Sequence, residues 1–140
     1  LIGANIHSDD ATVIWLPDGG TLLAGDTLED PATYVCEPQD FAAHLADLDR
    51  LAALGARAIL PNHGDPVRIA AGGYGPGLIG ATQRYVRWLM ALRDDPARAD
   101  TPLSQVIRDD LEAGHLVWFQ DYEEVHAENV ARTLAQFRHG

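Results

Sequence analysis

Two short apolar runs joined by a tight turn are the feature that most restricts how this chain can fold. Residues 11–16 are apolar and rich in β-branched and aromatic side chains, and residues 21–24 form a second apolar run. Residues 17–20, Pro-Asp-Gly-Gly, separate them. Proline presets φ in such a turn, and the glycines accept positive φ angles. The pattern predicts a β-hairpin whose second strand leaves the sheet at Gly25 and Asp26.

The rest of the chain contains one further strand and several helices. Phe41, Leu45 and Leu48 recur at helical spacing, which predicts a helix over residues 39–54 that stops at Gly55. The same reasoning predicts a short buried strand over residues 58–60 and helices over residues 78–93, 101–113 and 123–137. The order β-β-α-β-α-α-α predicts an α/β fold with helices packed on a mixed sheet.

The charge balance narrows the classes of partner. The chain has 140 residues, of which 21 are acidic and 10 are basic, all of them arginine, so the formal net charge is −11. A surface this acidic repels phosphate backbones, which argues against nucleic acid as a partner. No apolar run reaches the roughly 18 residues that a membrane span requires. The single Cys36 excludes an internal disulfide and any all-cysteine metal site.

Three polar residues lie in loops next to the predicted strands. His7 precedes the hairpin, Asp26 follows its second strand, and His63 follows the strand at residues 58–60. Two imidazoles and a carboxylate are ligands that suit zinc or iron, and loops at strand ends often carry binding residues. Taken singly, each residue has a simpler interpretation. A histidine in a loop can be a surface residue, and an aspartate after glycine can be a turn residue.

The order of these motifs resembles a known family over residues 7–66. His7 stands ahead of the hairpin, Gly-Asp-Thr follows the second strand at residues 25–27, and Pro-Asn-His-Gly follows the next strand at residues 61–64. This arrangement is similar to the C-terminal half of the metallo-β-lactamase superfamily fold, an αββα sandwich. The later helices are similar to the helical C-terminal extensions of some family members.

The resemblance implies a role for each of the three residues. His7 matches the third histidine of the first metal site, Asp26 the carboxylate that bridges two metals, and His63 the late histidine of the second site. The implied cofactors are two divalent metal ions, zinc first, with iron or manganese as alternatives. In the family, a hydroxide held between the metals attacks a carbonyl or phosphoryl centre. Asp26 is thus the candidate catalytic residue, and the implied substrate is a small-molecule ester, thioester, lactone, amide or phosphoester.

The family's His-x-His-x-Asp-His motif, which supplies further ligands to both metals, does not occur in this sequence. The chain therefore offers one terminal ligand to each metal and the bridge, fewer than the about three protein ligands per ion that a stable zinc site needs. Because the chain opens at Leu1 and its only methionine is Met90, we expect a longer parent protein. Residues 1–93 would be the C-terminal half of its domain and residues 94–140 a helical extension packed on that domain, inactive alone.

A second interpretation does not involve catalysis. Half of a sandwich fold leaves a sheet edge and an apolar face uncovered, and both features favour association. The chain could form a homodimer through that face, or bind another protein as an interaction module. A third interpretation is an unrelated α/β domain in which the motifs coincide by chance.

The other histidines have predicted structural roles. His126 lies on the apolar side of the last predicted helix, which favours packing over metal binding. His44 lies just off the apolar stripe of residues 39–54, so we expect it near solvent at a helix boundary. His115 and His139 are not placed like catalytic residues.

Two further features lie near the predicted site, an acidic pair at Asp9 and Asp10 and the thiol of Cys36. Asp9 and Asp10 could orient His7 through a hydrogen bond, or could form a solvated acidic turn. Cys36 lies in a loop bounded by prolines and has no basic neighbour in sequence to activate its thiol. We therefore interpret Cys36 as a bystander.

Overall fold

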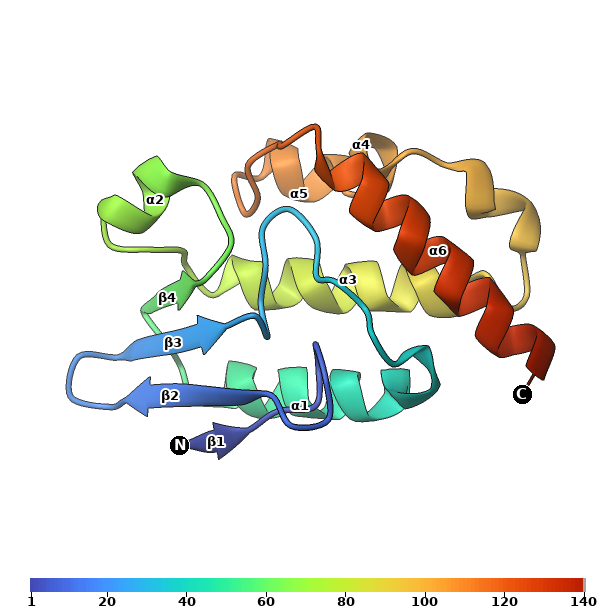
Figure 1. The fold of residues 1–140 in the computed structure, drawn as a ribbon. Helices are drawn as coiled ribbons and strands as arrows, with labels where there is room; N and C mark the ends of the chain where they lie inside the picture. The colour runs from blue at the N-terminus through green and yellow to red at the C-terminus, as the bar shows by residue number, and fades with distance from the viewer. Residues whose placement is uncertain (140) are drawn as a thin grey trace.

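The chain forms one mixed sheet from four strands, which lie across the sheet in the order β1 (Ile2–Gly3), β2 (Thr12–Leu16), β3 (Thr21–Gly25) and β4 (Ala58–Pro61) (Figure 1). The computed structural model describes residues 1–139, so Gly140, the last residue of the predicted extension, lies outside the described residues. The first two pairings are antiparallel, whereas β3 and β4 are parallel. A parallel pair needs a crossover connection, which here contains the helix α1 (Phe41–Ala53).

The hairpin between β2 and β3 has the turn that the sequence predicts. The N–H of Gly20 donates to the carbonyl of Pro17 at 3.2 Å, and Gly20 has a φ of +63°. Glycine adopts this angle without steric penalty. The register places Ile14 opposite Leu23, and both predicted strands are confirmed to within one residue.

Helices make up most of the remaining chain. They are α1, α2 (Pro66–Ala70), α3 (Gly77–Ala91), α4 (Leu103–Val106), α5 (Arg108–Glu112) and α6 (Tyr122–His139), with short 3-10 helices at Pro38–Asp40 and Pro96–Asp100. Figure 1 shows α1 behind β2 and α3 beside α1, with α6 crossing near α3. Within residues 1–139, no helix is both long and apolar enough to cross a membrane.

The two faces of the sheet differ in what covers them. On the inner face, Leu22 and Ile59 are fully buried in one core with side chains of α1 and α3. On the opposite face, Ile14 of β2, Leu23 of β3 and Leu60 of β4 are register partners. They form an apolar row, which we call the outer sheet face. Ile14 keeps 41% of its surface exposed.

Asn129 attaches α6 to the rest of the molecule. Its fully buried side chain accepts the N–H of Val35 at 2.9 Å and donates to the carbonyl of Thr33 at 2.8 Å. The same amide donates to the hydroxyl of Tyr85 at 3.0 Å. These bonds tie α6 both to the loop after β3 and to α3.

The prediction of a single helix over residues 101–113 is wrong. The structure has two short helices, α4 and α5, which meet at Ile107, a residue with a φ of −103° and a ψ of 13°. Thr101, where the predicted helix begins, does not cap α4, whose N-cap position is Pro102. Glu123 of α6 instead accepts the N–H of Leu103 at 2.9 Å. A tertiary contact therefore caps the start of this segment.

The helix α2 was not predicted, because five residues are too few to show a helical period. It begins after Asp65, whose side chain accepts the N–H of Arg68 at 2.9 Å. Pro66 occupies the first turn, where a backbone N–H would have no partner within the helix, so its missing N–H costs no hydrogen bond.

The expectation that His44 lies near solvent is wrong. His44 is fully buried, and neither ring nitrogen has a hydrogen-bond partner within residues 1–139. Its ring meets the ring of Phe41 edge-on, with the centroids 5.8 Å apart. The buried stripe of α1 runs through Phe41, His44, Leu48 and Leu51, so this helix is rotated slightly from the predicted stripe through Leu45.

Candidate functional site

Asp26 and His63 come together because β3 and β4 are parallel. Each residue follows the carboxyl end of its strand, and the carboxyl ends of neighbouring parallel strands meet at one edge of the sheet. The Nε2 of His63 lies 3.2 Å from the Oδ1 of Asp26. Asn62 donates to the same oxygen at 3.3 Å, and its N–H donates to the carbonyl of Gly25 at 2.9 Å. The His63 side chain keeps 59% of its surface exposed and that of Asp26 43%.

His7 belongs to the loop between β1 and β2. Because β2 is antiparallel to β3, residues just before β2 lie at the same edge as residues just after β3. The Nδ1 of His7 is 3.6 Å from the Oε1 of Glu29, too far for a hydrogen bond. Its Nε2 is 4.0 Å from the Sγ of Cys36, and its ring lies against that of Tyr34 with the centroids 5.9 Å apart.

Glu29 is the functional candidate that the sequence did not reveal. It is buried, and burial raises the pKa of its carboxyl. One oxygen accepts the N–H of Tyr34 at 3.2 Å, and the other accepts the hydroxyl of Tyr122 at 3.0 Å. Protonated His63 and His7 would act against this increase in the pKa. Glu29 lies beside His7, one of the two predicted histidine ligands.

Asp9 and Asp10 do not orient His7. Both are exposed, and Asp10 accepts a hydrogen bond from the hydroxyl of Ser8 at 2.7 Å. Of the two alternatives for this segment, the structure shows the solvated acidic turn. The carboxylate nearest to the His7 ring nitrogen is that of Glu29.

The predicted ligands suit a divalent metal ion in chemistry but not in number. Within residues 1–139, no group of three or more His, Cys, Asp or Glu side chains is spaced to hold a metal ion. Asp26 and His63 are in contact, whereas His7 lies beside Glu29 and Cys36. The Nδ1 of His7 is buried with no hydrogen-bond partner among the described residues. Side chains outside this set would be needed to complete a coordination shell.

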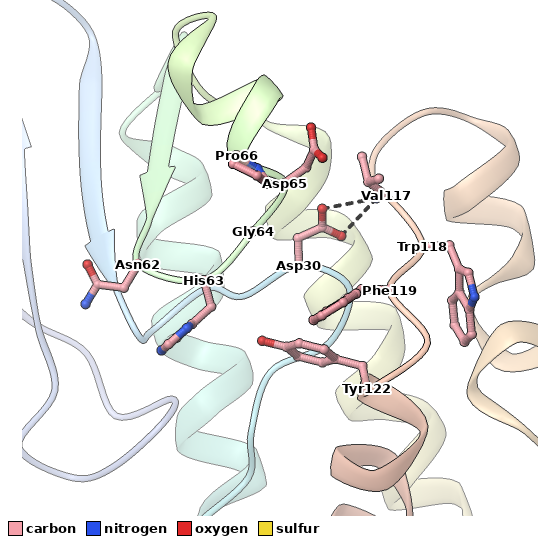
Figure 2. Close-up of a pocket in the computed structure, with 10 residues that line it drawn as sticks. All are labelled: Asp30, Asn62, His63, Gly64, Asp65, Pro66, Val117, Trp118, Phe119 and Tyr122. Atoms are coloured by element: carbon pink, nitrogen blue, oxygen red, sulfur yellow. Dashed lines mark hydrogen bonds between the residues drawn. The ribbon is translucent and has the colours of Figure 1, made fainter.

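A cavity of about 420 Å³ opens beside His63 (Figure 2). One side is formed by the loop after β4, and the other by the segment that leads into α6. Figure 2 shows Phe119 and Tyr122 projecting from that segment toward the side that holds His63 and Asp30. Its acidic, imidazole and aromatic lining residues are Asp30, His63, Asp65, Trp118, Phe119 and Tyr122.

Asp30 fixes the two sides of this cavity to each other. Its carboxylate accepts the N–H of Val117 with both oxygens, at 3.0 and 3.1 Å, and also the hydroxyl of Tyr74. Burial raises the pKa of Asp30, although these hydrogen bonds oppose the increase. The Tyr74 hydroxyl in turn accepts the N–H of Asp65 at 2.8 Å. One buried carboxyl thus connects the loop after β3 with the wall of the cavity.

Two further predictions for single residues concern His126 and Cys36. His126 is buried, with its Nδ1 2.9 Å from the hydroxyl of Tyr85 and its Nε2 2.9 Å from the carbonyl of Thr101, so its structural role is confirmed. Cys36 is exposed, and partial burial of its thiol raises the pKa. A thiol held in its neutral form is a poor nucleophile.

Comparison with known proteins supports the fold. No family model matches the chain, and no curated protein matches it. The structure is similar to the crystal structure of a metallo-beta-lactamase family protein from Thermus thermophilus, with a TM-score of 0.53 and 23% sequence identity. The match covers 99% of this chain and 43% of that one. The predicted α/β fold class, with a metallo-β-lactamase-like architecture, is confirmed, and the chain spans less than half of the length of its structural neighbour.

Proposed function

We propose that this chain supplies the C-terminal part of a metal-dependent hydrolase with the metallo-β-lactamase fold. The observation that carries the proposal is the contact between Asp26 and His63 at the carboxyl ends of parallel β3 and β4. The loop of His7 approaches the same edge of the sheet. The match to 43% of a solved structure of that family supports a larger whole.

In this proposal His7, Asp26 and His63 are ligands of two divalent metal ions, zinc first, or iron or manganese. Such ions activate water and polarise a carbonyl or phosphoryl oxygen. Asp26, the proposed bridging ligand and catalytic residue, is held by Asn62. The carboxylate of Glu29 lies 3.6 Å from the Nδ1 of His7. The substrate is a small-molecule ester, thioester, lactone, amide or phosphoester that enters through the cavity beside His63.

The 140-residue chain by itself is expected to be inactive. Its three proposed ligands are shared between two metal ions, and a stable site needs about three protein ligands around each ion. The whole protein would provide the other ligands from a His-x-His-x-Asp-His segment. The first test is therefore the coding sequence upstream of Leu1, which should contain that segment.

The second test is metal analysis of the protein expressed from its whole reading frame. His7→Ala, Asp26→Asn and His63→Ala should each lower the zinc content measured by mass spectrometry and abolish hydrolysis of the best ester or thioester substrate found. His139→Ala, a change at an exposed position on α6, is the matched control and should leave both unchanged. Full zinc content and activity in all three variants would contradict the proposal.

A second candidate function is self-association through the outer sheet face. Ile14 and Leu16 of β2 are 41% and 45% exposed, and Leu23 and Leu60 lie beside Ile14 in the same row. Exposed apolar side chains in one contiguous patch are typical of interaction surfaces. In this case the chain would act as a homodimer, without catalysis.

A further inference from the structure

We propose that the cavity beside His63 binds the alkylammonium group of a small molecule, that is, a cationic nitrogen carried on an apolar body. The inference rests on the proposed function in treating this cavity as the substrate side of a hydrolase site. It would make the substrate a cationic ester or amide. Binding of the ammonium group itself needs no metal ion, so it can be tested separately.

Aromatic side chains form one wall of the cavity. The rings of Phe119 and Tyr122 form it and lie 6.0 Å apart at a 49° tilt, whereas the indole of Trp118, a third lining residue, projects to the other side of the segment (Figure 2). Phe119 is 55% exposed, although it is a large apolar residue. Figure 2 shows its ring between Asp30 and Tyr122, open to the cavity. Aromatic ring faces attract cations, and quaternary ammonium ligands are recognised by groups of such side chains.

Carboxylates form the opposite side. Asp30 and Asp65 line the cavity, and Asp26 lies just beyond His63. Asp30 is occupied by Val117 and Tyr74, but Asp65 is partly exposed and uses its Oδ2 to cap α2. Of these two lining carboxylates, Asp65 is therefore the one that keeps an oxygen available to a bound cation.

Among the residues that line the cavity in the described chain, none is arginine or lysine. Arg68 lies outside the lining, although its charge lowers the pKa of Asp30. Its guanidinium lies 5.1 Å from the ring centre of Tyr74 and donates to the carbonyl of Gly114 at 2.7 Å. The two lining carboxylates, Asp30 and Asp65, and the net charge of −11 over the whole chain favour a cation in the cavity over a carboxylate or phosphate.

Three probes of the same shape separate charge from hydrophobicity. They are choline, its uncharged counterpart 3,3-dimethylbutan-1-ol, and the anion 3,3-dimethylbutanoate. Each is titrated into the 140-residue chain, freed of metal by a chelator and dialysed, and followed by NMR. The backbone N–H of Trp118 should shift, whereas the indole N–H groups of Trp15 and Trp88, which lie outside the cavity, should not. Choline should bind about two- to fivefold more tightly than the alcohol, as expected for a partly exposed cation–π contact, and the anion should not bind.

Two variants and a control locate the effect. Phe119→Leu keeps an apolar side chain but removes the ring, so it should weaken choline binding by about two- to fivefold and leave the alcohol unaffected. Asp65→Asn keeps a residue that can cap α2, and it should weaken choline binding only. Asp18→Asn removes the same charge from the exposed hairpin turn and should change nothing.

Equal or tighter binding of the alcohol or the anion would overturn the proposal, as would the absence of a choline-dependent shift at Trp118. An effect of Asp18→Asn equal to that of Asp65→Asn would overturn it as well, because only the overall charge would then matter. These results are independent of the metal site. If the whole protein holds divalent metal ions but does not bind choline, only this inference is contradicted. If it binds choline but holds no divalent metal ion, only the hydrolase proposal is contradicted.

Discussion

At the scale of single residues, the buried imidazole of His44 links the stability of the fold to pH. Burial lowers the pKa of His44 from its usual 6.5. Below pH 6.5 the unfolded chain takes up a proton that the folded chain does not, so stability is complete above that pH and falls as the solution becomes more acidic. Burial also lowers the pKa of His126, which adds to the same trend.

We expect His44→Leu to stabilise the protein, and to do so more strongly in acid. At about pH 7.5 the gain is about 1 kcal/mol, because two unpartnered nitrogens are replaced by apolar groups. Below pH 6.5 it should grow by up to about 1.4 kcal/mol per pH unit. Urea unfolding at several pH values measures both, with His139→Leu as the control. A gain that is the same at every pH would refute this account of His44.

Single residues of the site were predictable where strand-end geometry decides their position. Asp26 and His63 each follow a strand, and the parallel pairing of those strands brings them to 3.2 Å. Glu29 could not be found in this way. Its hydroxyl partner Tyr122 is 93 positions away, and no local pattern indicates that α6 returns to this loop.

At the scale of elements, Asn129 holds α6 in place. We expect Asn129→Ala to lower the free energy of unfolding by about 2–4 kcal/mol, since it leaves the buried Val35 N–H and Thr33 carbonyl without partners. Urea unfolding measures the loss. Glu124→Ala, at an exposed position on the same helix, should change stability by less than about 0.5 kcal/mol. Equal effects of the two changes would show that α6 does not depend on this side chain.

Asp30 should control the order of the segment before α6. Asp30→Ala removes the acceptor of the Val117 N–H and the Tyr74 hydroxyl, so we expect a loss of about 2–4 kcal/mol. Hydrogen exchange at the Val117 amide should accelerate by more than exchange at the buried amides of β3. Asp95→Ala, an exposed aspartate in another connection, is the comparison. Unchanged exchange at Val117 would contradict the proposed role of Asp30.

The elements themselves were predictable to differing degrees. The hairpin, α1, α3 and α6 follow from apolar spacing and turn residues, which act locally. The start of α4 was not predictable from its own segment, because Glu123, which accepts the N–H of Leu103, belongs to α6. A tertiary contact thus caps this helix.

At the scale of the whole molecule, the outer sheet face and the net charge of −11 act in opposite directions on self-association. We expect light scattering to detect more dimer as salt rises from about 0.1 M to about 1 M, because the Debye length shortens from about 10 Å to about 3 Å. Ile14→Thr combined with Leu16→Thr should suppress the dimer. Val67→Thr, on an exposed valine of α2, should not. If the Ile14→Thr and Leu16→Thr variant forms as much dimer as the original chain, the interface does not involve the outer sheet face.

The parallel pairing of β3 and β4 also has a consequence for how the chain tolerates changes in length. The register shifts between Leu23 and Gly25, just before the strand reaches Asp26. One residue inserted or deleted in β3 would turn its side chains to the opposite face and carry Asp26 away from His63. The connection before α4 imposes no such condition. Natural variants of this protein should therefore differ in length there and keep the spacing from Thr21 to Asp26 constant.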